Sequence, residues 1–228
     1  MKRIIRIFSR RTKATPDDEL AVVGRGPFLW DEADEVHVSV TFTWDLPAAD
    51  RLARLWRPVA PVLIGGPATG DGGGEFVPGM YLKNGYVITS RGCPNHCWFC
   101  AVPKREGKIV RELSVKNGIN VLDSNLLACS ESHIKSVFAM LAKQPGRIEF
   151  TGGLEAARMK PWIARELKNL HPKQLFFAYD TEDDLEPLRA AGKMLVENGK
   201  LCNTNGPGRG RLLGRCANTL LREGRNDE

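Results

Sequence analysis

From residue 86 to residue 199 the sequence alternates short apolar segments with longer amphipathic ones. The apolar segments are rich in Val, Ile and Phe, which is typical of buried strands, and the amphipathic segments have the spacing of helices. Strands joined by helices run parallel, because parallel neighbours need a long crossover connection. We therefore predict an α/β fold, either an open doubly wound sheet or part of a barrel. The predicted strands are residues 86–90, 120–123, 147–150 and 174–180.

The amphipathic segments have suitable helix starts. Ser130 is a good N-cap residue, Pro161 suits a first turn, and Thr181 precedes three acidic residues that favour a helix N-terminus. In α/β proteins, functional groups gather at the carboxyl ends of the strands. The polar segments expected there are residues 91–100, 123–125 and 152–155, and Asp180.

A second, smaller unit precedes this region. The segment EVHVSVTF (35–42) predicts a strand, and PVLIGG (61–66) predicts a short buried strand. Between them a helix is expected after Pro47, with one apolar face. The unit is thus a small βαβ unit, whose predicted helix face comprises Ala49, Leu52, Ala53 and Trp56.

Glycine and arginine content indicates the boundaries of these regions. Residues 65–79 are rich in glycine and predict a loop or linker. The last segment combines arginines and glycines without an apolar run, so no further buried strand is expected there. We therefore divide the chain into an N-terminal βαβ region (1–77), a core (78–199) and an irregular tail (200–228).

The composition limits the class of protein. With 42% hydrophobic and 26% charged residues, the chain is expected to form a packed core. It has no apolar run near the roughly 20 residues that span a bilayer, and its basic N-terminus lacks the apolar centre of a secretory signal. The net charge of +6 is spread along the chain, so nucleic-acid binding is not indicated. We expect a cytoplasmic protein without a membrane partner.

The segment RGCPNHCWFC contains Cys93, Cys97 and Cys100 with the spacing C-x3-C-x2-C. Clustered cysteines in a cytoplasmic protein favour metal binding over disulfides. Three thiolates can hold three irons of a [4Fe–4S] cluster and leave the fourth iron open. The alternative is a zinc site with His96 or Cys129 as fourth ligand, although zinc sites usually use two separated ligand pairs.

This segment resembles the cluster loop of the radical S-adenosylmethionine superfamily, in which an aromatic residue, here Phe99, precedes the last cysteine. The resemblance covers roughly residues 78–199. It implies a partial (β/α) TIM-like barrel, with a [4Fe–4S] cluster on Cys93, Cys97 and Cys100 and S-adenosylmethionine on the open iron. It also implies an enzyme that acts on an unknown substrate through a 5′-deoxyadenosyl radical, with an electron donor such as a flavodoxin or ferredoxin.

The resemblance also implies a polar strand end that binds the amino group of S-adenosylmethionine. In the family this is a glycine-rich segment, which Gly152, Gly153 and Glu155 resemble. An earlier strand, 120–123, ends in polar residues that are suited to the same task, so Asp123 and Asn125 are the other option. Both options stay open at this point.

Two departures from the family bear on function. The βαβ region resembles the last part of a cobalamin-binding domain, but the D-x-H-x-x-G signature is absent, so no cobalamin is expected. The core shows four strands, whereas the family's usual core has six. The alternative function is therefore a non-catalytic iron–sulfur or zinc-binding module, or a truncated and inactive remnant of such an enzyme.

Overall fold

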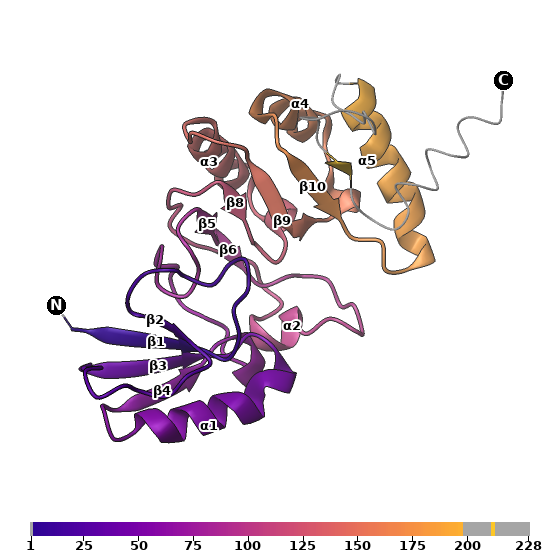
Figure 1. Cartoon of the computed structure of the whole chain (residues 1–228). Coiled ribbons are helices and arrows are strands. Elements are labelled where there is room, and N and C mark those ends of the chain that lie inside the picture. Colours follow the sequence, from indigo (N-terminus) through magenta and orange to yellow (C-terminus); the bar gives the residue numbers. More distant parts are fainter. Residues whose placement is uncertain (1, 198–210, 213–228) are drawn as a thin grey trace. The chain divides into compact units, whose positions relative to one another are not determined.

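The computed structural model describes residues 2–197 and 211–212 (Figure 1). Contacts within the chain divide it into two compact units. The first comprises Met1–Tyr86 and Asn95–Lys108, and the second comprises Val87–Pro94 and Ile109–Glu228. None of the helices in the described part is long and apolar enough to cross a membrane.

The first unit has a four-stranded parallel sheet with the order β2-β1-β3-β4. Its strands are β1 (Ile4–Phe8), β2 (Ala21–Val23), β3 (Glu35–Ser39) and β4 (Val62–Gly65). Helix α1 (Leu46–Trp56) joins β3 to β4, which confirms the predicted strand–helix–strand order. The strands β1 and β2 were not predicted.

Helix α1 packs its apolar face on this sheet. The predicted face is buried, and Trp56 is fully covered, with its indole N–H donating to the carbonyl of Arg25 at 3.0 Å. The expectation of a buried strand at residues 61–66 is wrong in part, because β4 lies at the sheet edge and Leu63 is 59% exposed. The core of this unit includes Ile5, Ile7, Val36, Val38, Ala49, Leu52, Ala53 and Trp56.

The segment that follows the glycine-rich loop packs within the first unit. The Arg6 guanidinium donates to the carbonyls of Gly79 and Met80 at 2.8 and 3.0 Å. The Tyr81 hydroxyl lies 2.6 Å from His37 Nδ1. Because these contacts hold residues 79–81 to the first unit, the division of the chain follows residue 86 and not residue 77. A short helix, α2 (Val102–Arg105), also belongs to this unit.

The second unit has a five-stranded sheet whose strands follow one another in chain order. They are β5 (Tyr86–Val87), β8 (Asn120–Val121), β9 (Glu149–Leu154), β10 (Gln174–Phe177) and β11 (Arg211–Leu212). The pairs from β8 to β11 are parallel, so the predicted α/β class is confirmed. Within the described residues the sheet has two ends, and no barrel is formed.

Three helices connect these strands and pack in succession, α3 against α4 and α4 against α5 (Figure 1). Two of the predicted caps are present. Ser130 Oγ accepts from the His133 N–H at 3.2 Å, and Thr181 forms a reciprocal capping box with Asp184 before α5. The helices are α3 (Glu131–Ala142), α4 (Pro161–Leu170) and α5 (Leu185–Glu197).

Two other short pairings differ from expectation. The predicted strand at 86–90 is split, because Ser90–Arg91 (β6) pairs antiparallel with Arg111–Glu112 (β7). In the predicted irregular tail, β11 lies beside β10 as a two-residue strand. The remainder of residues 200–228 lies outside the described residues.

Candidate functional site

The three motif cysteines follow β6 and are divided between the two units. Cys93 belongs to the second unit and is 9% exposed. Cys97 is exposed and Cys100 is half-buried, and both belong to the first unit. Gly92 has a φ of 89°, so the chain turns through the left-handed region immediately before Cys93. The aromatic residue of the motif, Phe99, is 44% exposed.

Within the second unit, Asn125 connects two other predicted site residues. Its amide nitrogen donates to Cys93 Sγ at 3.4 Å and to Glu155 Oε2 at 2.6 Å. Asn125 follows β8 and Glu155 follows β9, so the carboxyl ends of neighbouring parallel strands place them together. Sequence analysis missed Arg158, whose Nε donates to the same Glu155 oxygen at 2.6 Å. Its position three residues after Glu155 was the available signal.

The side-chain oxygen of Asn125, Oδ1, has no hydrogen-bond partner among the described residues, although the atom is buried. The residue is only 4% exposed. An unsatisfied buried acceptor is rare in proteins and costs free energy, so it points to a donor from outside the described part of the chain.

The two predicted glycines at the end of β9 have different roles. A Cβ at Gly152 would lie 2.4 Å from the Asp123 carbonyl oxygen, so this glycine lets β9 approach the end of β8. Gly153 has a φ of 71°, and a Cβ there would have no heavy atom within 4 Å. The space that a side chain would take at Gly153 is therefore open.

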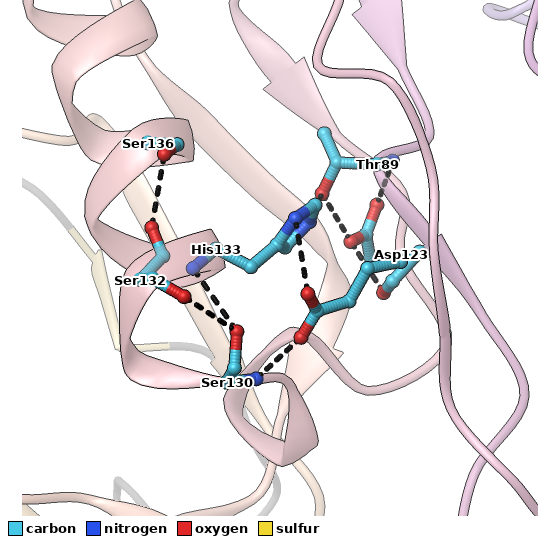
Figure 2. Close-up of polar contacts among 8 residues, drawn as sticks. Thr89, Asp123, Ser130, Ser132, His133 and Ser136 are labelled. Carbon is cyan, nitrogen blue, oxygen red and sulfur yellow. Dashed lines mark hydrogen bonds and ion pairs between the residues drawn. The ribbon is translucent and has the colours of Figure 1, made fainter.

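Asp123 lies at the centre of a buried hydrogen-bond network (Figure 2). Its carboxylate accepts from the Thr89 N–H, the Thr89 hydroxyl and the Ser90 hydroxyl, each at 2.6 Å. The side chain is 1% exposed. Burial raises the pKa of Asp123, while the hydrogen bonds from Ser90 and Thr89 oppose that rise. These contacts tie the end of β8 to the chain just before Cys93.

His133, on α3, joins the same network and is buried. The residue is 8% exposed, and its Nε2 lies 3.2 Å from Thr89 Oγ1 (Figure 2). Because the Thr89 hydroxyl donates its only proton to Asp123, it accepts from His133, which places a ring proton on Nε2. His133 precedes Val137 by four residues on the apolar face of α3, a spacing that could have revealed its burial.

Asp123, Cys129 and His133 together form a possible metal-binding group. Their ligand atoms all lie within 4.8 Å of one another, and oxygen, sulfur and nitrogen donors of this kind suit zinc. In the structure, however, the Asp123 carboxylate already accepts from the hydroxyls of Thr89 and Ser90. His133 is hydrogen-bonded to the Thr89 hydroxyl. Burial raises the pKa of the Cys129 thiol to about 12, so this thiol is neutral at pH 7.

Cys129 is expected to resist alkylation in the folded protein, whereas the exposed Cys97 is expected to react. Iodoacetamide treatment of metal-free protein at pH 8, followed by peptide mass spectrometry, measures both sites. The unfolded thiol titrates near 9.0 and the folded one at about 12, so this thiol's contribution to stability is lost as the pH rises between these values. Equal labelling of Cys129 and Cys97 would contradict this prediction. The Cys129→Ser variant is the control, because the peptide whose label it removes is the one that contains Cys129.

The fold and the site define an α/β protein in which a three-cysteine motif follows one strand and polar residues lie at the carboxyl ends of two others. Comparison with protein-family models gives no match. Comparison with curated proteins gives no significant match either. The function is therefore inferred from the chain's own residues.

Proposed function

We propose that this chain is a radical S-adenosylmethionine enzyme that binds a [4Fe–4S] cluster through Cys93, Cys97 and Cys100. The observation that carries the proposal is the contact of Asn125 with both Cys93 and Glu155. It joins the first cysteine of the motif to the end of β9, one of the two strand ends that the family resemblance offers for S-adenosylmethionine. This contact supports the proposal, because one side chain connects a proposed cluster ligand to a proposed cofactor ligand.

The residues in the second unit fit a cluster ligand at Cys93. The thiol is largely buried and receives an amide N–H, the type of hydrogen bond that tunes iron–sulfur clusters through their sulfurs. Asp123 holds Thr89 and Ser90 in place immediately upstream. When bound, the cluster supplies the single electron that cleaves the sulfonium of S-adenosylmethionine.

The end of β9 fits a cationic amino group. Glu155 offers a carboxylate oriented by Arg158 and Asn125, and the side-chain oxygen of Asn125, which has no partner among the described residues, offers a second acceptor. The open space at Gly153 allows a ligand to approach the backbone. An ammonium group has three donors and satisfies such acceptors. Phe99 remains a proposed contact to the same cofactor.

The proposal extends to fold and partners. Because the strands of the second unit follow one another in chain order without reversal, the sheet is compatible with a sector of a partial (β/α) barrel. We propose a cytoplasmic enzyme that receives electrons from a protein such as a flavodoxin or ferredoxin, and its substrate is not identified. The second candidate is a non-catalytic iron–sulfur or zinc-binding module. The absence of barrel closure within the described residues favours this second candidate.

Anaerobic reconstitution with iron and sulfide is expected to give a brown, oxygen-sensitive protein, because three thiolates can hold three of the four irons. Iron and acid-labile sulfide are measured per chain. Each single alanine variant of Cys93, Cys97 or Cys100 should lose the cluster. Alanine variants of the cysteines outside the motif, at Cys129, Cys202 and Cys216, are matched controls that should retain it.

Formation of 5′-deoxyadenosine separates the two candidate functions. The reconstituted protein, supplied with S-adenosylmethionine and dithionite, should release it, whereas the Cys93→Ala variant should not. A protein that carries zinc and no sulfide would contradict the cluster. A protein that holds the cluster but never forms 5′-deoxyadenosine would be the non-catalytic module.

A further inference from the structure

The side chain of Asn125 has one hydrogen-bonding position left over. Its amide nitrogen has two hydrogens, and the two bonds described for it go to Cys93 Sγ and to Glu155 Oε2. Its carbonyl oxygen is buried and has no partner in the described part of the chain. Asn125 therefore has one contact with a proposed cluster ligand, one with a proposed cofactor ligand, and one vacant acceptor.

The orientation of this amide is fixed by its neighbours. If the amide were flipped, its carbonyl oxygen would face the Glu155 carboxylate at 2.6 Å, and two acceptors at that distance repel. The backbone is also held, because the main-chain carbonyl oxygen of Asn125, as distinct from the side-chain oxygen, accepts from the Ala128 N–H at 3.2 Å at the start of a 3₁₀ turn. The amide nitrogen of Asn125 therefore keeps its hydrogen bonds to Cys93 and Glu155, and the acceptor without a partner among the described residues is the side-chain oxygen.

We propose that Asn125 couples the ligand site to the cluster ligand Cys93, an inference that rests on the proposed function. A cationic donor bound to the carbonyl oxygen and to Glu155 polarises the amide, which strengthens its N–H bond to the Cys93 sulfur. Donors to a cluster sulfur stabilise the more negative, reduced state. Binding of S-adenosylmethionine thus raises the reduction potential of the cluster through Asn125, which is a positioning residue and does not itself react.

The proposal is tested with two substitutions that separate the donor from the acceptor. Asn125→Leu removes both, whereas Asn125→Asp keeps an acceptor oxygen and removes the donor. Loss of the carbonyl acceptor to a cation should weaken S-adenosylmethionine binding roughly tenfold or more, because a hydrogen bond to a charged group contributes about 1.5–3 kcal/mol. The matched control is Asn169→Leu, an exposed asparagine on α4.

The reduction potential of the reconstituted cluster is measured by redox titration with and without S-adenosylmethionine, and iron content is measured in every variant. The wild type and Asn169→Leu should show an upward shift on binding. In Asn125→Leu and Asn125→Asp the potential without ligand should be lower and the shift smaller. The shift that remains in Asn125→Leu measures the effect of the ligand that does not pass through Asn125.

Equal shifts in the wild type and Asn125→Leu would overturn the coupling while leaving the proposed function intact. A wild type without a cluster would instead overturn the proposed function. If both Asn125 variants lose iron, Glu155→Gln provides the test, because it weakens the ligand site and keeps the amide on Cys93. Its potential without ligand should match the wild type and its shift should be smaller, and an unchanged shift would reject the proposal.

Discussion

The Asp123→Ala substitution is expected to lower the free energy of unfolding of the second unit by about 3–5 kcal/mol, since three donors lose their acceptor and each buried unsatisfied donor costs about 1–3 kcal/mol. Those donors are the Thr89 N–H and the hydroxyls of Thr89 and Ser90. The two hydroxyls can rotate toward other acceptors, but the backbone N–H cannot. His133, which donates to Thr89, loses its fixed position as well.

Denaturant unfolding of the metal-free protein measures this effect. Asp180→Ala is the matched control, because Asp180 also follows a parallel strand of the same sheet but is exposed. It should change stability by less than about 0.5 kcal/mol, as is usual for surface positions. Ser90→Ala removes one of the three donors, so its loss of unfolding free energy should lie between those of Asp123→Ala and Asp180→Ala. If Asp123→Ala and Asp180→Ala unfolded at the same denaturant concentration, the network would not stabilise the second unit.

The Gly152→Ala substitution is expected to lower the free energy of unfolding by about 3 kcal/mol or more, at the upper end of the usual cost of overpacking. The added Cβ would lie 2.4 Å from the Asp123 carbonyl oxygen and 2.5 Å from the Leu122 carbonyl carbon. Both atoms belong to the backbone, so no side-chain rotation relieves the clash. The ends of β8 and β9 would have to separate, which would also displace Asn125 from Glu155.

Alanine substitutions at two other glycines serve as controls, because each is expected to change the free energy of unfolding by a different amount or in the opposite direction. Gly153→Ala meets no neighbour but forces alanine into the left-handed region, which costs roughly 1–2 kcal/mol. Gly192→Ala, in α5 with open space around it, should stabilise the protein by roughly 0.5–1 kcal/mol. Thermal or denaturant unfolding should rank the variants in this order. A Gly152→Ala protein as stable as Gly153→Ala would show that the two strand ends are not in close contact.

The helices were predictable because the signal for a helix is local. The apolar spacing of α1 and α3 to α5 lies within each segment, and the caps at Ser130 and Thr181 involve residues three positions apart. The strand β1 was missed for an equally physical reason. Arg6 interrupts its apolar run, and the sequence does not show that this arginine is buried, with its guanidinium hydrogen-bonded to the distant Gly79 and Met80.

The sequence by itself determined the α/β class, the positions of α1 and of α3 to α5, and the polar residues at the carboxyl ends of the strands. Only the tertiary structure decided which of those polar residues meet. Asn125 lies 32 residues from Cys93 and 30 from Glu155, and His133 lies 44 from Thr89. Such contacts depend on which strands are neighbours and on their register, and the spacing of residues within a segment carries no record of either.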